Sequence, residues 1–290
     1  MDQAKALSLG FIGGGQMCEA MLRGLLEGGV VEARNVTISE PYDARRQYLA
    51  KTFGPDLKLT DVNTDVLKSD AVILAVKPQV CYAVLSDLVN KARQDAKVLN
   101  HRQYDFVFPL LISIVAGKPI SRLSGFSSQM GASRVARLMP NTPAMVGESA
   151  TAFALSENCL PSDEELVRRI VRSLGPVGIK VEENVMDAVT GLSGSGPAFA
   201  FMFIEALADA GVHQGLPRDV AMKLAAQTLV GAGKMVLEEN KHPGALKDSV
   251  CSPGGTTIEG VLALESGGLR GIVMQAVVAA TQRSKELSKL

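Results

Sequence analysis

The chain has little that could hold a metal, a disulfide framework or a nucleic acid. Its 290 residues include four cysteines, three histidines and no tryptophan, and 30 Lys and Arg balance 30 Asp and Glu. No cysteine pair has C-x-x-C spacing and the histidines do not cluster, which argues against zinc, iron–sulfur and disulfide-rich classes and favours a reducing compartment. The cysteines are Cys18, Cys81, Cys159 and Cys251. The balanced charge leaves small molecules, rather than nucleic acid or anionic membrane, as the expected partners.

Long apolar runs and a leader segment are also missing. The longest candidate run, Phe106–Ala116, is shorter than the roughly 20 residues that span a bilayer and contains Pro109, so we expect no membrane segment. The first predicted strand begins near Leu7, which leaves no room for a signal or transit peptide and makes the cytoplasm the expected location.

The most informative segment that is present is a glycine turn near the start of the sequence, Leu-Gly-Phe-Ile-Gly-Gly-Gly-Gln-Met-Cys. Leu7–Ile12 is predicted to be a strand, Gly13 to make the tight turn, and Gly15 to let the backbone approach a pyrophosphate. The following helix, Gln16–Glu27, would point its positive end at that anion. Cys18 departs from the G-x-G-x-x-G/A pattern but is small enough for close packing of helix and strand. The alternative is a glycine-rich turn of any α/β protein.

The pattern of apolar residues along the sequence changes near residue 180. Before it, apolar runs alternate with helical patterns such as Tyr42–Phe53 and Ser162–Leu174, which predicts a Rossmann-like doubly wound sheet over 1–181. The predicted strands after the first are Val36–Ser39, Leu57–Thr60, Ala71–Val76, Leu111–Val115, Arg134–Met139, Ala150–Leu155 and Val177–Val181. An insertion at about 99–110 carries Tyr104, Phe106 and Phe108; we interpret it as a surface loop of this lineage or as a retained intron in the gene model.

From 182 to 290 the patterns predict helices only. They are Glu183–Gln214, Pro217–Asn240, Pro243–Val250, Thr256–Glu265 and Leu269–Leu290. Apolar residues lie on more than one face of these helices, so we expect a partner subunit to cover them. Within the first helix, Gly and Ser residues and Pro197 predict a kink where a nicotinamide ring or another helix comes close.

Glu40 ends the second strand about 25 residues beyond the glycine turn, where an acidic residue accepts hydrogen bonds from ribose hydroxyls and repels the extra phosphate of NADPH. This favours NADH. Arg45 and Arg46 follow one turn into the next helix and could instead pair with that phosphate. The cofactor is therefore predicted as NADPH or NADH.

Five segments together resemble pyrroline-5-carboxylate reductase, and they occur in order between about Leu9 and Leu287. Besides the glycine turn they are Ala-Val-Lys-Pro-Gln from Ala75, Arg-Leu-Met-Pro-Asn-Thr-Pro from Arg137, Thr-Gly-Leu-Ser-Gly-Ser-Gly-Pro-Ala from Thr190, and Leu-Lys-Asp-Ser-Val-Cys-Ser-Pro-Gly-Gly-Thr-Thr from Leu246. The resemblance implies reduction of 1-pyrroline-5-carboxylate to L-proline, the last step of proline biosynthesis. It also implies helical domains interlocked in a dimer, with dimers gathered in rings that are commonly decamers.

The last segment makes chemical sense as an anion site. Pro253 and the glycines end one helix and Thr256 opens the next, so the unpaired N–H groups of Gly255, Thr256 and Thr257 would face a small carboxylate together. The alternative is an ordinary helix start with Thr256 as N-cap. By resemblance this loop holds the substrate carboxylate, Thr257 reaches the ring nitrogen as the catalytic residue, and Glu183 lies near the substrate.

The resemblance further assigns cofactor positions. These are Gly13, Gly14, Gly15, Gln16 and Met17 in the turn, Glu40, Asn63, the loop Ala75, Val76, Lys77 and Pro78, and Asn141. No metal site is predicted.

The chemistry of an imine explains why no histidine is needed. A cyclic imine is basic enough to take its proton from solvent, so a hydrogen-bond partner at nitrogen suffices, unlike the acid or base that a ketone requires. His101, His213 and His242 are predicted to be structural or surface residues. Two other function classes are the alternatives. A β-hydroxyacid dehydrogenase would place a lysine between Glu182 and Glu205, where this chain has none, and a non-enzymatic NAD(P)H sensor has no reason to keep the anion loop.

Overall fold

The computed structural model describes residues 6–98, 109–128 and 134–289. The predicted insertion at about 99–110, together with His101, therefore lies almost wholly outside the described residues. The chain forms two compact units. The first comprises Met1–Gly194 and Ala280–Leu290, and the second comprises Ser195–Ala279.

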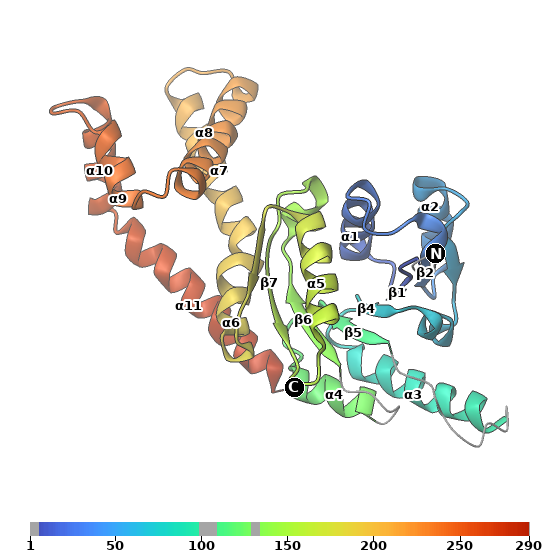
Figure 1. Cartoon of the computed structure of the whole chain (residues 1–290). Helices are drawn as coiled ribbons and strands as arrows, with labels where there is room; N and C mark the ends of the chain where they lie inside the picture. Colours follow the sequence, from blue (N-terminus) through green and yellow to red (C-terminus); the bar gives the residue numbers. More distant parts are fainter. Residues whose placement is uncertain (1–5, 99–108, 129–133, 290) are drawn as a thin grey trace. The chain divides into compact units, whose positions relative to one another are not determined.

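The first unit is built on an eight-stranded sheet of order β3-β2-β1-β4-β5-β6-β7-β8 (Figure 1). All neighbouring strands pair in parallel except β6 and β7, which are antiparallel. The strands are β1 Leu9–Ile12, β2 Val36–Ser39, β3 Lys58–Thr60, β4 Ala71–Leu74, β5 Leu110–Ser113, β6 Val135–Met139, β7 Ala150–Leu155 and β8 Val177–Lys180.

Helices cover both faces of this sheet, and each face has its own apolar core. α1 (Gln16–Glu27), α2 (Asp43–Phe53) and α5 (Pro161–Leu174) pack on the face that carries Phe11, Ile38 and Phe153. The short helix η2 (Asn63–Lys68), α3 (Cys81–Val98), α4 (Ile120–Ser128) and α6 (Met186–Val189) pack on the other face, which carries Ile12 and Leu74. The predicted doubly wound class is confirmed.

The sequence patterns misjudged one connection in the sheet. The chain passes from β6 to β7 through residues 140–149, which hold only the 3-10 helix η3 (Thr142–Val146). A parallel crossover needs a dozen or more residues, so this short link returns the chain antiparallel. Most other predicted strand limits differ from the structure by one or two residues.

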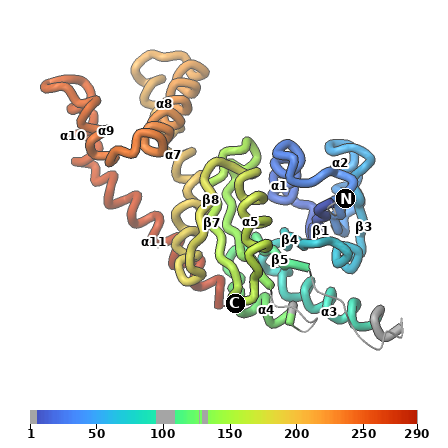
Figure 2. The backbone as a smooth tube through the Cα atoms, viewed as in Figure 1, coloured from blue at the N-terminus to red at the C-terminus, as the bar shows by residue number. Residues whose placement is uncertain are grey.

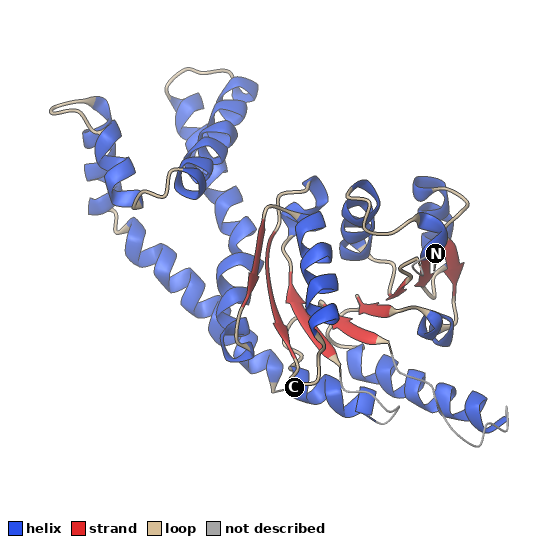
Figure 3. Cartoon of the chain, viewed as in Figure 1, coloured by secondary structure: helices blue, strands red, loops and turns tan. Residues whose placement is uncertain are grey.

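Every described element after β8 is helical (Figure 3). The predicted helix Glu183–Gln214 is broken into η4 (Glu183–Val185), α6, a π-helical turn at Thr190–Gly194 and α7 (Gly196–His213). The break falls where Gly194, Gly196 and Pro197 weaken the α-helical hydrogen-bond ladder. The remaining helices are α8 Arg218–Glu238, α9 Pro243–Val250, α10 Thr256–Ser266 and α11 Leu269–Ser288, close to the predicted limits. Figure 2 traces this succession along the tube.

The second unit buries little apolar surface. Its described core cluster consists of Ala208, Ala221 and Ala225, where α7 packs on α8. Large apolar side chains on its helices are exposed, among them Phe201, Met202, Leu262 and Met274.

Two helical stretches, Glu183–His213 and Arg218–Glu238, are long and apolar enough to cross a membrane, and α10 with α11 would make a third if that bent pair counted as one span. The expectation that no segment meets this test was wrong. These helices pass the test because charged residues such as Glu205 are sparse along them, which keeps their average hydropathy high.

Candidate functional site

The glycine turn joins β1 to α1 and has backbone geometry that a larger residue could not adopt. Gly13 has a φ of 98°, and a Cβ atom there would lie 2.7 Å from the carbonyl oxygen of Ala75. Gly15 precedes α1 as its N-cap and has open space where a side chain would be. The first amides of α1 lack intrahelical partners and lie at the positive end of the helix dipole. The turn is thus shaped to receive an anion such as a pyrophosphate.

The turn is held from the end of β2 and from α2. Gly13 N donates to Ser39 O at 2.8 Å, and Gly14 N donates to Glu40 Oε2 at 2.8 Å. From α2, Arg45 Nε donates to Gly14 O at 2.5 Å and Arg45 Nη2 to Gly15 O at 3.3 Å. The backbone of the turn is therefore fixed on its N–H side and on its carbonyl side.

A cavity of about 260 Å³ lies at the carboxyl edge of the sheet. Its walls are mostly apolar, which suits a flat ring, and ligands of doubly wound sheets bind at this edge. It is lined by Met17, Ala75, Val76, Ile114, Met139, Pro140, Asn141, Thr142 and Gly194. The structure thus brings together four predicted cofactor positions, Met17, Ala75, Val76 and Asn141. A Cβ atom on Gly194 would approach Met139 Cε to 2.7 Å, so the π-helical turn packs closely against this edge.

Asn141 is buried, and both the nitrogen and the oxygen of its side-chain amide form hydrogen bonds inside the protein. Its Nδ2 donates to Ser193 O at 3.1 Å, while its Oδ1 accepts from Ser149 Oγ at 3.0 Å and from Ala150 N at 3.2 Å. The side chain thereby joins the end of β6 to the π-helical turn and shapes the cavity through that contact.

Other predicted cofactor positions are placed around the same edge. Asn63 opens η2 and accepts a hydrogen bond from Ser39 Oγ at 2.6 Å, which ties it to the end of β2. Lys77 is exposed and Pro78 half-buried in the loop after β4, and Gln16 is exposed at the start of α1. The residues present therefore fit a dinucleotide that runs from the end of β2 across the turn to the 260 Å³ cavity.

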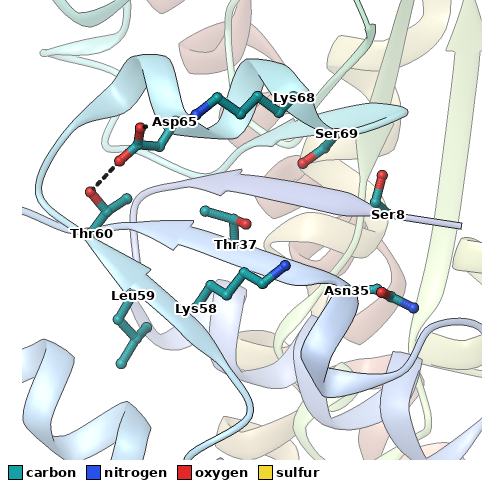
Figure 4. A pocket seen from close by; sticks show the side chains of 9 residues that line it. All are labelled: Ser8, Asn35, Thr37, Lys58, Leu59, Thr60, Asp65, Lys68 and Ser69. Carbon is teal, nitrogen blue, oxygen red and sulfur yellow. Dashed lines mark hydrogen bonds and ion pairs between the residues drawn. The ribbon is translucent and has the colours of Figure 1, made fainter.

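A second, larger cavity of about 410 Å³ lies elsewhere on the unit (Figure 4). Its wall combines Ser8 and Asn35, just before β1 and β2, with Lys58 and Thr60 of β3 and with Asp65 of η2. Asp65 accepts from Thr60 Oγ1 at 2.8 Å. Ser8 and Asn35 mark the amino ends of their strands, away from the edge where doubly wound sheets bind dinucleotides.

The predicted anion loop begins α10 in the second unit. Gly254 has a φ of 64°, and Gly255 is the N-cap. The prediction of an unpaired Gly255 N–H was wrong, because this amide donates to Ser252 O at 3.0 Å within the turn. The alternative with Thr256 as a capping residue was wrong, because Thr256 is the first helical residue and no side chain among the described residues caps this end. The first amides of an 11-residue helix therefore stay available to an anion beside the half-buried Thr257.

Glu183 lies in a contact that sequence patterns did not reveal. Its Oε1 accepts from Ile120 N at 2.6 Å and from Arg137 Nη1 at 3.2 Å. Arg137 is 4% exposed, and its Nη2 has no hydrogen-bond partner among the described residues. The buried arginine needs this carboxylate, and only the folded chain shows that β6, α4 and η4 meet there.

Burial disfavours the ionised form of two cysteine thiols, Cys18 in α1 and Cys81 in α3. Burial raises the pKa of the Cys18 thiol far above its ordinary range, and burial raises the pKa of Cys81 to about 11 while Lys118 partly opposes the shift. All four cysteines are free. Cys18 thus fills the third small position of the turn as a neutral packing residue.

Comparison with known proteins agrees with this geometry. A family model described as pyrroline-5-carboxylate reductase dimerisation matches residues 183–287, and one described as NADP oxidoreductase, coenzyme F420-dependent, matches residues 8–100. The pyrroline-5-carboxylate reductase of Glycine max is 42% identical over 98% of this chain and 97% of its own length. The chain belongs to the pyrroline-5-carboxylate reductase family.

Two further members extend this result. The pyrroline-5-carboxylate reductase of Methanosarcina acetivorans is 43% identical over 97% of this chain and 98% of its own length. The Plasmodium falciparum pyrroline carboxylate reductase, solved with NADP bound, is 31% identical with a TM-score of 0.81, covering 97% of this chain and 98% of that one. The resemblance read from the five segments is confirmed, and so is the predicted class, an NAD(P)H-dependent oxidoreductase acting on a C=N bond (EC 1.5.1.2) in proline biosynthesis.

Proposed function

We propose that this pyrroline-5-carboxylate reductase binds NAD(P)H at the glycine turn and its substrate at the Ser252–Thr257 loop, and reduces 1-pyrroline-5-carboxylate to L-proline. The observation that carries the proposal is the presence of two different anion-binding helix starts. One follows a strand at the carboxyl edge of the sheet and suits a pyrophosphate, and the other follows Gly254 and Gly255 and suits a carboxylate.

The reaction adds one hydride and one proton to a C=N bond. Bound NAD(P)H supplies the hydride, which goes to the imine carbon, and the ring nitrogen carries a proton taken from solvent. The amides of Thr256 and Thr257, at the helix start that Gly255 caps, hold the substrate carboxylate, and the Thr257 hydroxyl hydrogen-bonds at the ring nitrogen. Thr257 orients the imine rather than serving as a strong acid, since the imine is already basic.

The two parts of the chain have different proposed roles. We propose residues 1–181 as the dinucleotide-binding part and 182–290 as the substrate-binding and oligomerisation part. The four contacts of Arg45, Glu40 and Ser39 with Gly13, Gly14 and Gly15 support the first assignment. The exposed apolar helices and the match to a dimerisation model support the second.

We further propose that two copies pair through the helical region and that dimers gather into rings, as resemblance to the family implies for decamers. A cytoplasmic location is consistent with four free cysteines, two of them wholly buried. Light scattering of the purified chain gives the assembly mass directly, and a monomer at micromolar concentration would contradict the pairing.

Activity is tested by the loss of absorbance of NADH or NADPH on adding 1-pyrroline-5-carboxylate, with proline quantified as product. We expect one proline per cofactor oxidised. Oxidation with a β-hydroxyacid in place of the imine would support the dehydrogenase alternative, and cofactor binding without turnover of either substrate would support the sensor alternative.

A further inference from the structure

Glu40 stands at the position where an acidic residue usually faces the adenosine ribose, yet its side chain points elsewhere. Its Oε2 accepts from Gly14 N at 2.8 Å and its Oε1 accepts from Tyr42 N at 3.0 Å. The residue is only 7% exposed. Both oxygens are thus engaged with backbone amides, and burial leaves little of the carboxylate for a ribose hydroxyl.

The turn is built to receive this carboxylate. Gly14 is buried, and a Cβ atom there would lie 3.2 Å from Glu40 Cβ and 2.9 Å from Leu49 Cδ1, so a larger residue would require both of these side chains to shift. A backbone amide buried without an acceptor is costly, and Glu40 supplies the acceptor for Gly14.

Two arginines complete the arrangement from the other side. Arg45 donates to the carbonyl oxygens of Gly14 and Gly15 and forms an ion pair with Glu19 at 2.8 Å. Arg46 Nη1 donates to the carbonyl oxygen of Glu40 itself at 2.7 Å. The two peptides on either side of Gly14 are therefore both held: a carboxylate accepts from the N–H of the Gly13–Gly14 peptide, and a guanidinium donates to the carbonyl of the Gly14–Gly15 peptide.

We infer that Glu40 is a positioning residue that locks the glycine turn in its cofactor-binding shape, rather than a residue that selects NADH over NADPH. The inference rests on the proposed role of the turn in binding NAD(P)H. Because the turn meets the pyrophosphate, which both cofactors share, loss of the lock weakens both to the same extent. A selecting residue would act on one cofactor alone, through the ribose.

The test is a titration of the purified, cofactor-free oligomer with NADH and with NADPH in the absence of substrate, in which nicotinamide fluorescence reports binding. For Glu40→Ser we expect both dissociation constants to rise about tenfold and their ratio to change less than about threefold. Glu40→Gln keeps one acceptor oxygen and should weaken both cofactors by a smaller factor. Glu27→Ser is the matched control, since it removes an exposed carboxylate from the last residue of α1, at the opposite end of that helix from the turn; it should change neither constant.

One further readout separates a positioning role from a general effect on stability. Hydrogen exchange at the Gly14 and Tyr42 amides should be slow in the unliganded wild type and fast in Glu40→Ser and Glu40→Gln. A tenfold or larger gain for NADPH over NADH in Glu40→Ser would overturn the inference and restore the selecting role expected from the sequence, as would unprotected Gly14 in the wild type. Failure of wild type to bind either cofactor would instead contradict the proposed function.

Discussion

The two units of this reductase differ in how far they bury their large apolar side chains. The sheet unit buries Phe11, Ile73 and Phe153 completely between its strands and helices. The helical unit, whose described core is three alanines, leaves Phe201 61% exposed and Met274 68% exposed. Burial of such side chains stabilises a fold by about 1.5 to 3 kcal/mol each, so the helical unit gains this energy only when another surface covers it. A second copy of the chain is the partner that the dimerisation match indicates.

The largest effect on this difference between the units is expected when charged residues replace two exposed apolar residues of the helical unit. Phe201→Glu combined with Met274→Glu should raise the dissociation constant of the assembly at least about a hundredfold, because two carboxylates cannot enter an apolar interface unpaired. Val146→Glu is the control, since Val146 is 76% exposed in the sheet unit and should leave the mass unchanged. Sedimentation velocity measures both, and dissociation by the control alone would reverse the assignment of the interface.

A second prediction concerns the glycine turn of the sheet unit, where we expect the dinucleotide to bind. Gly13→Ala places a methyl group 2.7 Å from Ala75 O at a φ of 98°, so the turn must shift and both cofactors should bind about a hundredfold more weakly. Gly125→Ala in α4 meets nothing within 4 Å and should bind them normally. Equilibrium titration distinguishes the two. Unchanged affinity in Gly13→Ala would mean that the dinucleotide binds elsewhere.

A third, smaller effect is expected at the contact between Glu183 and Arg137, where the chain passes from the last strand to the helices. Glu183→Ala leaves Arg137 and Ile120 N without their acceptor, and should lower the free energy of unfolding by about 2 kcal/mol with an unchanged KM for the imine. The neighbouring exposed Glu182→Ala should change neither quantity. Denaturant titration and steady-state kinetics test both variants, and a tenfold rise in KM at constant stability would favour the predicted contact of Glu183 with substrate.

The smallest effect is a pH dependence confined to the sheet unit. The neutral Cys81 thiol has its pKa raised by burial from an ordinary 9.0 to about 11. Because the pKa is higher in the folded state, the contribution to stability is complete below pH 9 and is lost as the pH rises through 11. The free energy of unfolding should fall over this window less steeply in Cys81→Ala than in wild type or in Cys251→Ala. Equal slopes in all three proteins would show that folding does not raise the pKa of Cys81.

The comparison also shows what a sequence can and cannot reveal. The glycine turn and the helix Gln16–Glu27 were predictable because local residues decide them, through the strand, the positive φ of Gly13 and the period of α1. The antiparallel β7 was missed because a link of ten residues shows no helix or hairpin signal of its own. The breaks at Thr190–Gly194 were foreseen only as a kink, since a π-helical turn depends on packing against Met139 and Asn141.

The candidate site divides in the same way. Its residue types were read from motifs, but their partners depend on three-dimensional contacts between distant segments. Glu40 was expected to face ribose and instead binds Gly14, 26 positions away. Arg137 was noted only within a motif, and its pairing with Glu183 joins residues 46 positions apart. No local pattern encodes such distances.

The central claim is that the two anion-binding helix starts serve different molecules, and Thr257→Ala tests it most directly. We expect turnover to fall about a hundredfold, because the imine loses its hydrogen-bond partner, while the dissociation constants of NADH and NADPH stay within twofold of wild type. Thr228→Ala removes another hydroxyl of the helical unit, one that bonds Leu224 O, and should leave both quantities unchanged. Loss of cofactor binding in Thr257→Ala, with turnover preserved at saturating cofactor, would contradict the account.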